Sequence, residues 1–360
     1  MKFFDLNLSG PGLRGELDQA YGRVMDSGWM ILGPELAAFE AEFAAWCGAA
    51  QCVGVGNGLD ALTLTLRAAG VQAGAEVIVP AHTFAATWMA VEALGAVPVP
   101  VEVDPLTYTI GAAACAAAVT GKTAAIVPVS LYGHPVDLEP LMALARRHGL
   151  FVLEDAAQSH GAASNGLRTG SVAHATAFSF YPTKNLGALG DAGAVTTNDA
   201  GIAERLRRLR NYGSDQKYVH QTLGVNSRLD ELQAAFLRVF LPRLDAANDQ
   251  RRALASAYDA ALSGSGLTTP AEANGARHVY HLYVVRSPER DALQTRLKTA
   301  GIETLIHYPI ACHLQAAFAH RGFKRGDFPL AEALADEVLS LPLWPAMPVE
   351  NVQQVALAAR

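Results

Sequence analysis

The sequence predicts an α/β protein with a larger domain, built on a mostly parallel sheet of seven strands, and a smaller C-terminal α+β domain. Short apolar runs alternate with helical patterns over the first two-thirds of the chain. Strands that are regularly separated by helices form parallel sheets covered on both faces. The pattern then changes near residue 245. With 360 residues, of which 51% are hydrophobic, the chain can bury a sizeable core and form about two domains, or one large α/β domain with an appendage.

Seven apolar runs are the predicted strands of the larger domain, and five stretches with helical spacing lie between them. The strands are Cys52–Val55, Glu76–Val79, Val97–Val103, Ala124–Val129, Leu150–Glu154, Ala175–Phe180 and Ala194–Thr197. The helices are Pro34–Cys47, Asp60–Ala69, Phe84–Leu94, Leu138–His148 and Ala200–Arg210. Sheets of this kind bind ligands at the carboxyl ends of their strands, so the residues that follow each run are the first candidates for a site.

A further helical stretch, Leu229–Leu244, is expected to lead out of the larger domain. This places the two domains at residues 1–244 and 245–360. The second domain is expected to combine two strands and two helices: His278–Arg286, Glu289–Ala300, Glu303–His307 and Val349–Ala359.

The charge and the cysteines narrow the class of function. The net charge is −6 and no basic block is visible, so neither nucleic acid nor an anionic membrane is an expected partner. The four cysteines are scattered and form no CxxC pair, which predicts reduced thiols in the cytoplasm and no metal centre. The first residues lack the apolar stretch of a signal peptide, and the sequence contains no run of about 18 apolar residues, the length needed to span a bilayer.

Three segments carry candidate chemistry, and the first is the glycine turn Val53–Leu62. Its pattern predicts a strand, a turn and the start of a helix, and the backbone N–H groups at a helix start can hold a phosphate. A dinucleotide site would need the pattern GxGxxG, but Leu59 stands at the last glycine position. From this segment alone, a tight turn without a ligand and a phosphate site are equally favoured.

The second segment, Phe151–Gly161, places Asp155 at the end of a buried strand. A carboxylate in that position needs a cationic partner or strong hydrogen bonds, and the protonated ring nitrogen of a cofactor would be one such partner. Capping of the following turn is the commoner role of a lone aspartate. His160 is either a substrate ligand or, more commonly for a lone histidine, a structural residue.

The third segment, Ala177–Gly193, contains Lys184 in a glycine-rich turn with nearly uncharged surroundings. Desolvation lowers the pKa of a lysine, and a neutral amine can attack a carbonyl. Alone, Lys184 could as well be a surface residue. In sequence order, however, the three segments give a phosphate turn, an aspartate at a strand end and a lysine, which are the parts of a pyridoxal phosphate site.

With these motifs the chain resembles the DegT/DnrJ/StrS-type sugar aminotransferases, which have the type I fold of pyridoxal-phosphate-dependent transferases, as aspartate aminotransferase does. The resemblance spans nearly the whole chain, from Ser27–Glu35 to Leu339–Pro345, and its most specific stretches are Glu154–Gly161 and Phe178–Gly193. It implies pyridoxal 5'-phosphate as the cofactor, L-glutamate as the amino donor and a nucleotide-linked keto sugar as the acceptor.

The resemblance also assigns roles to individual residues. Lys184 matches the lysine that holds the cofactor and moves the proton, and Asp155 the partner of the pyridinium nitrogen. The other matched cofactor contacts are Gln158 beside the ring hydroxyl, Phe84 stacked on the ring, and Ser179 with the backbone of Gly58 and Leu59 around the phosphate. Asn226 matches an asparagine that reaches the phosphate of a neighbouring subunit, which implies a homodimer with shared sites; otherwise it is a loop residue making local turn bonds.

A narrower similarity concerns the substrate. The stretches Asn57–Leu62, Phe84–Trp88, Asn211–Ser214 and Lys217–Tyr218 are similar to the branch that aminates C3 of dTDP-linked 3-keto-6-deoxyhexoses. The sugar pocket is then expected to involve Trp29, Tyr181, Lys217, Tyr218, His307, Tyr308 and His313, each of which could instead be packing or pocket wall. C4 amination of a dTDP-, GDP- or UDP-linked 4-keto-6-deoxyhexose, or C3 amination of a UDP-linked 3-keto uronic acid, remains the alternative. The pathway, O-antigen or other lipopolysaccharide synthesis as against a glycosylated metabolite, stays open.

Two departures and three rival functions are weighed against this interpretation. Leu59 replaces the threonine common in the wider family, and Ala192 stands where glycine is usual, which would be strained if φ were positive there. Related sugar dehydratases carry histidine in place of Lys184, and an NAD enzyme is disfavoured by the broken glycine pattern. A catalytically idle regulator is disfavoured by the intact set of Lys184, Asp155 and Gln158.

Overall fold

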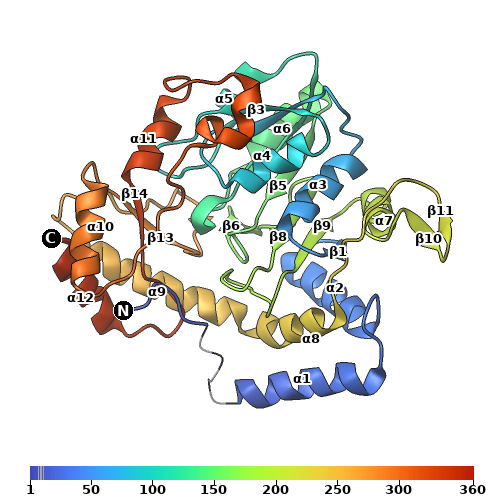
Figure 1. The fold of residues 1–360 in the computed structure, drawn as a ribbon, viewed down its shortest axis with the longest axis horizontal. Helices are drawn as coiled ribbons and strands as arrows, with labels where there is room; N and C mark the ends of the chain where they lie inside the picture. The colour runs from blue at the N-terminus through green and yellow to red at the C-terminus, as the bar shows by residue number, and fades with distance from the viewer. Residues whose placement is uncertain (7, 9, 11) are drawn as a thin grey trace.

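The computed structural model describes residues 1–360 except 7, 9 and 11, and its centre is the predicted seven-stranded sheet (Figure 1). The strand order is β1-β9-β8-β5-β4-β2-β3, and β9 alone runs antiparallel to both of its neighbours. All seven expected strands form, within a few residues of their predicted ends: β1 (Gln51–Val55), β2 (Glu76–Pro80), β3 (Val97–Val101), β4 (Thr123–Ile126), β5 (Phe151–Asp155), β8 (Ala175–Ser179) and β9 (Gly193–Thr197).

Helices cover both faces of the sheet, because its strands alternate apolar side chains between two buried layers. On β2, Val77 and Val79 pack into one layer and Ile78 into the other. The first layer contains α3 (Gly58–Ala68), α4 (Ala85–Glu92) and α7 (Ala200–Leu209). The second contains α2 (Pro34–Cys47), α5 (Ala112–Ala118) and α6 (Leu138–His148).

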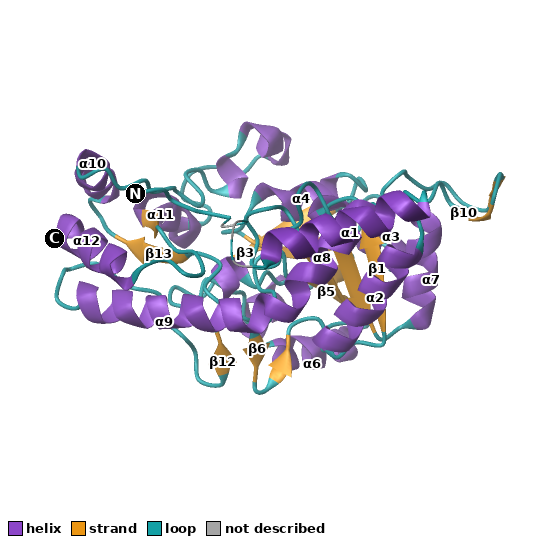
Figure 2. Cartoon of the chain, turned by 90° about the horizontal axis from the view of Figure 1, so that it is seen from below, coloured by secondary structure: helices purple, strands orange, loops and turns teal. Residues whose placement is uncertain are grey.

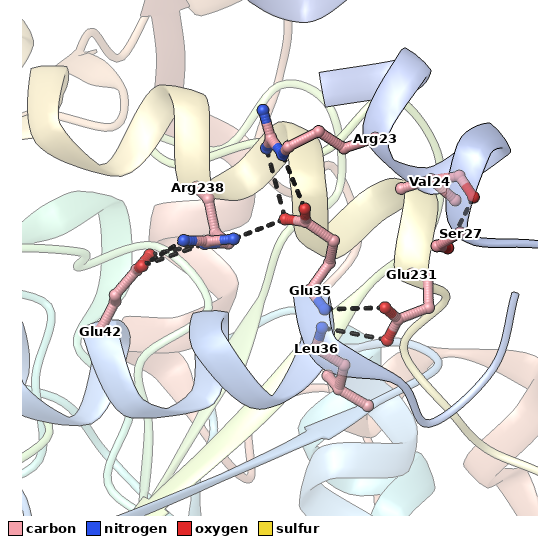
Figure 3. Close-up of polar contacts among 8 residues, drawn as sticks. All are labelled: Arg23, Val24, Ser27, Glu35, Leu36, Glu42, Glu231 and Arg238. Carbon is pink, nitrogen blue, oxygen red and sulfur yellow. Dashed lines mark hydrogen bonds and ion pairs between the residues drawn. The ribbon is translucent and has the colours of Figure 1, made fainter. Parts of the chain in front are cut away.

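Helices α1 (Leu13–Ser27) and α8 (Glu231–Phe240) add a layer beside α2, and buried acidic groups join the three. Figure 3 shows the carboxylate of Glu231, on α8, at the start of α2, where its oxygens accept the backbone N–H groups of Glu35 and Leu36 at 2.8 and 3.0 Å. The Glu35 side chain accepts from Arg23 on α1 and from Arg238 on α8. One helix thus supplies the N-terminal cap of another.

The smaller C-terminal part has a core of its own around β13 (Tyr283–Arg286) and β14 (Val338–Leu341), which pair antiparallel. The later turns of α9 (Leu244–Leu262) contribute to this core, together with α10 (Arg290–Thr299) and α12 (Val349–Ala359). Helix α11 (Pro329–Glu337) instead packs against the larger part, with Leu334 in the same cluster as Ile78 on β2. The division at residues 244 and 245 stays a prediction. In Figures 1 and 2 both chain ends lie at this end of the molecule, where Glu303 donates its backbone N–H to the carbonyl of Met1.

Several elements differ from those that the sequence predicts. Only the last four residues of the expected strand His278–Arg286 pair as β13, and Glu303–His307 forms a single bridge, between Leu305 and Ser340. The sequence pattern gave no helix before Pro34, although α1 buries Leu17, Ala20 and Val24 at helical spacing. The predicted stretch from Leu229 to Leu244 is interrupted near Leu241 by the short helix η2.

The remaining elements are short. They are β6 (Ala163–Ser164), β7 (Leu167–Arg168) and β12 (Ala276–Arg277) in one small sheet, β10 (Ser214–Gln216) and β11 (Val219–His220) in a hairpin, and the 3₁₀ turns η1 (Leu131–Gly133), η2 (Leu241–Arg243), η3 (Cys312–Leu314) and η4 (Ala316–Arg321). The β10–β11 hairpin projects from the body in both Figure 1 and Figure 2. Within the described residues, no helix is both long and apolar enough to cross a membrane.

Candidate active site

One cavity of about 460 Å³ lies where β5, β8 and the start of α3 meet, and most of the predicted site residues line it. The carboxyl ends of neighbouring parallel strands open at the same edge of the sheet, so side chains that follow them come together. Ten predicted residues line the cavity: Gly58, Leu59, Phe84, Asp155, Gln158, Ser179, Tyr181, Lys184, His307 and Tyr308.

The glycine turn forms the end of the cavity that can hold an anion. Asn57 caps α3, because its side-chain oxygen accepts the N–H of Asp60 at 2.8 Å. The first N–H groups of the helix, those of Gly58 and Leu59, have no carbonyl one turn earlier to bind, and they carry the positive end of the helix dipole. A Cβ on Gly58 would lie 2.6 Å from the Cβ of Ser179, so only glycine allows the end of β8 to approach this turn so closely.

Asp155, the last residue of β5, is a buried carboxylate with two hydrogen-bond donors. The hydroxyl of Thr87 donates to one oxygen at 2.8 Å, and the N–H of Ala157 donates to the other at 3.2 Å. Burial raises the pKa of Asp155, while these two bonds and the positive charge of Lys184 oppose the rise. The carboxylate is therefore suited to a further cationic partner in the cavity.

Lys184 lies in the turn after β8, where its backbone N–H donates to the backbone carbonyl of Tyr181 at 2.8 Å. Burial lowers its pKa to about 8, and the negative charge of Asp155 opposes this shift. The next residue anchors the turn, because the side chain of Asn185 donates to that of Asn248, on α9, at 2.8 Å. The amine is thus more readily neutral than that of an exposed lysine, and it is held on an anchored turn.

The opposite wall comes from both parts of the chain. The side-chain oxygen of Gln158 accepts the backbone N–H of Tyr132 at 2.6 Å, and the side-chain NH₂ of Gln158 donates to the hydroxyl of Tyr308 at 2.9 Å. The ring of Tyr308 lies 5.2 Å from that of Phe84, centre to centre. Gln158 is therefore fixed in one orientation, and an aromatic pair closes this side of the cavity.

The sequence pattern did not identify four lining or supporting residues: Asn57, Thr83, Thr87 and His281. His281 lines the cavity, its Nδ1 lies 3.2 Å from the side-chain oxygen of Asn185, and burial lowers its pKa well below the usual range. The spacing of the two threonines, one helical turn apart around Phe84, was the available signal for them. His281 gave none, because it falls in a stretch with the pattern of a strand.

Five predicted residues lie outside the cavity of their own chain. Asn226 is exposed and forms a bridge with Asn211, Trp29 is 58% exposed, and Lys217 and Tyr218 lie in the projecting hairpin. His313 is buried, with its Nε2 3.0 Å from a carboxylate oxygen of Glu332.

Two further expectations concern buried residues near the site. His160 is fully buried against the rings of Phe178 and Phe180 and does not line the cavity, as for a core residue. Ala192 is not among the residues with positive φ, so the condition under which alanine would be strained there is not met. In the described chain, no three His, Cys, Asp or Glu side chains gather closely enough to hold a metal ion.

The sequence profile of the DegT/DnrJ/EryC1/StrS aminotransferase family matches residues 12–360. The chain belongs to this family. It is therefore an aminotransferase, and the cavity that holds Lys184 and Asp155 is the candidate active site of a family member. The observed type I aminotransferase fold agrees with the resemblance noted from the sequence.

Two relatives match almost the whole chain. The "erythromycin biosynthesis sensory transduction protein EryC1" of Saccharopolyspora erythraea is 54% identical, over 98% of this chain and 97% of the relative. The "dTDP-3-amino-3,4,6-trideoxy-alpha-D-glucose transaminase" of Streptomyces venezuelae is 50% identical, over 99% of this chain and 95% of the relative.

Two solved structures share the fold closely. DesV of S. venezuelae, solved in complex with a ketimine intermediate, is 50% identical with a TM-score of 0.98, covering 100% of this chain and 97% of its own. NtdA of Bacillus subtilis, solved with bound cofactor PMP, is 30% identical with a TM-score of 0.92, covering 100% of this chain and 84% of its own.

Proposed function

We propose that this aminotransferase uses pyridoxal 5'-phosphate to move an amino group from L-glutamate to C3 of a dTDP-linked 3-keto-6-deoxyhexose. The observation that carries the proposal is the cavity itself, which brings a lysine, a buried carboxylate and a free helix start together. The choice of C3 and of dTDP is supported by the printed name of the S. venezuelae relative, at 50% identity over nearly the whole chain.

The residues in the cavity fit the proposed cofactor. Asp155 is a buried carboxylate whose protein donors are two neutral groups, so it can accept a bond from a protonated ring nitrogen. The N–H groups of Gly58 and Leu59, with the hydroxyl of Ser179, are suited to a phosphate. Leu59 has no side-chain hydroxyl to offer the phosphate, but its backbone N–H can still donate a hydrogen bond to it. Phe84 and Gln158 also line the cavity, where they would contact the ring face and the ring hydroxyl of the bound cofactor.

The chain's own residues would divide the reaction as follows. Bound pyridoxal phosphate supplies a protonated ring that accepts the electron pair left on carbon when a proton is removed. Lys184 takes the proton from the α-carbon of L-glutamate and later gives a proton to C3 of the sugar, so it serves as base and then as acid. Asp155 keeps the ring protonated. Glutamate leaves as 2-oxoglutarate and the keto sugar leaves as an amino sugar.

The substrate residues divide into two groups by position. Tyr181, His307 and Tyr308 line the cavity and are proposed to contact the sugar. Trp29, Lys217, Tyr218 and Asn226 lie outside the cavity of their own chain, so we propose that they act in a homodimer, at or near the cavity of the partner. His313 is proposed to act on the sugar only indirectly, because it is buried against Glu332. We propose the cytoplasm as the compartment, which the four free, buried cysteines support.

A half-reaction tests the substrate. The protein is loaded with pyridoxal phosphate, converted to the amine form with L-glutamate, and freed of glutamate. A dTDP-4-keto-6-deoxyhexose is then added with and without a 3,4-ketoisomerase, and the absorbance of the aldehyde form is followed. Return of this absorbance only with the isomerase is the expected result. Return without the isomerase would instead place the enzyme in the C4-aminating branch.

A further inference from the structure

Thr87, in the first turn of α4, forms its hydrogen bond with another element and not within its own helix. Threonines inside helices commonly bond to the carbonyl one turn earlier, as Thr63 does to Leu59 at 2.9 Å and Thr65 to Ala61 at 2.6 Å. Thr87 instead donates to the carboxylate of Asp155 at 2.8 Å, on a different element. Its hydroxyl is therefore committed to the candidate site and not to its own helix.

A second hydroxyl stands behind the first. The oxygens of Thr83 and Thr87 lie 3.1 Å apart. An ionised carboxylate accepts hydrogen bonds only, so the Thr87 hydroxyl proton points at Asp155, and its oxygen is free to accept the hydroxyl proton of Thr83. Both threonines and Asp155 are at most 5% exposed. The two O–H groups thus form a short chain, directed at one carboxylate and shielded from water.

The backbone carbonyl that Thr87 leaves free has its own partner, since the thiol of Cys312 donates to the carbonyl of Thr83 at 3.2 Å. The turn between the two threonines also carries Phe84 in the cavity wall. The stacking aromatic and the donor to Asp155 are therefore placed by one turn of backbone, which contacts the C-terminal part of the chain.

We propose that Thr87, supported by Thr83, is a positioning residue that keeps Asp155 ionised and directed at the ring nitrogen of the cofactor. This rests on the proposed function, because it needs pyridoxal phosphate in the cavity. A donor to a carboxylate favours its charged form, so loss of the hydroxyl makes Asp155 hold a proton more strongly. The proton shared with the ring nitrogen then lies nearer Asp155, and the ring accepts electrons less well.

Three variants of the pyridoxal phosphate-loaded enzyme test this. Thr87→Val removes the hydroxyl and keeps the shape, Thr87→Ser keeps the hydroxyl, and Thr65→Val is a matched control in a buried helical threonine that does not contact Asp155. The single-turnover rate with L-glutamate is measured, together with bound cofactor and the pH dependence of the visible spectrum. The other titratable groups that interact with Asp155 are Lys184, Glu154 and Tyr308, and they are unchanged in all three variants.

We expect Thr87→Val to retain bound cofactor but to lose about 10- to 100-fold in rate, the worth of a hydrogen bond to a charged group. Its spectrum should change with pH at a different midpoint from that of the wild type. Thr87→Ser and Thr65→Val should resemble the wild type in both measurements. A structural role alone would lower stability and cofactor content without moving the spectral midpoint.

Two results would overturn the assignment: a Thr87→Val rate and midpoint equal to those of Thr65→Val, or a Thr87→Ser variant as slow as Thr87→Val. If Thr87→Val does not fold, Thr87→Ala, which also lacks the hydroxyl, takes its place, and a rate and midpoint equal to those of Thr65→Val would equally overturn the assignment. A wild-type protein that takes up no pyridoxal phosphate would defeat the proposed function itself, which is a distinguishable outcome.

Discussion

At the scale of single residues, the candidate site depends on groups whose chemistry is altered by burial. Lys184 and Asp155 lie at or just after the ends of neighbouring strands. Burial lowers the pKa of Lys184 and raises that of Asp155, so it favours the neutral form of both, while the charge of each residue opposes the shift of the other. The lowered pKa of Lys184 was expected from its nearly uncharged surroundings in the sequence, whereas the raised pKa of Asp155 depends on how its strand end is buried. The residue types and their order along the chain were sufficient to identify both residues as candidates.

The first prediction concerns the lysine. Lys184→Ala removes the proposed base, acid and covalent anchor together, and it should leave the fold intact while steady-state transamination falls by at least about 10⁴-fold, as for loss of a group that acts in several steps. Turnover with L-glutamate and the keto sugar is the measurement, with circular dichroism as the control for folding. Near-normal turnover of this variant would contradict the central assignment.

The pH dependence of cofactor uptake follows from the pKa of the same lysine. A pKa lowered from 10.5 to about 8 means that the amine becomes mostly neutral above pH 8 and protonated below it. The initial rate at which the apoprotein captures pyridoxal phosphate should therefore rise up to about pH 8 and then level off. A stopped-flow series checks this, with a simple alkylamine as reference. A rate that keeps climbing to about pH 10 would show an ordinary lysine.

Sequence patterns predicted some of the site residues and missed others, for a physical reason. The lysine, the aspartate and the glycine turn each follow an apolar run, and topology brings such positions to one edge of the sheet. Thr87 and His281 come from inside a helix and from an irregular stretch, so their places in the site depend on packing between distant segments.

At the scale of elements, the seven strands were predictable because buried strands of a parallel sheet are apolar on both faces. Helix α1 was missed because its buried stripe is narrow, with three buried residues in fifteen. The expected strand from His278 was shortened because the backbone before Tyr283 bonds to the turn at Tyr132 and Gly133 and so has no strand partner.

The cap that α8 provides to α2 leads to a prediction about stability. The buried carboxylate of Glu231 accepts three backbone N–H groups at 2.8 to 3.0 Å: those of Glu35 and Leu36, which Figure 3 shows, and that of Gly33. Glu231→Gln keeps the size of the side chain but removes its charge and one acceptor oxygen, so we expect the free energy of unfolding to fall by roughly 1–3 kcal/mol. The urea midpoint of the apoprotein is the measurement.

The matched control lies in the same view. Glu42, 42% exposed, pairs with Arg238 at 2.7 Å. An exposed ion pair contributes about 0–1 kcal/mol, so Glu42→Gln should change the urea midpoint little. Equal effects of the two substitutions would show that the cap at α2 contributes no more than a surface contact.

At the scale of the whole molecule, the cavity of one chain does not contain every residue that the family resemblance assigns to the site. Asn226 is exposed and outside the cavity, but its neighbour Ser227 is buried and donates to Asp60 at 2.6 Å, close to the glycine turn. The loop is therefore fixed at its base, while Asn226 itself is exposed. This placement fits an asparagine that serves a second subunit.

Mixed dimers test whether two chains share a site. Lys184→Ala and Asn226→Asp, the latter placing a negative charge where a phosphate is expected, should each inactivate the homodimer. If Lys184 of one chain and Asn226 of the other serve the same cavity, a heterodimer has one site with both lesions and one intact site. Random reassortment should then restore about a quarter of wild-type turnover, since about half the dimers are mixed and each has one working site. Sedimentation of the mixture verifies that dimers form. If both residues serve the cavity of their own chain, every site keeps one lesion, and mixing will restore no activity.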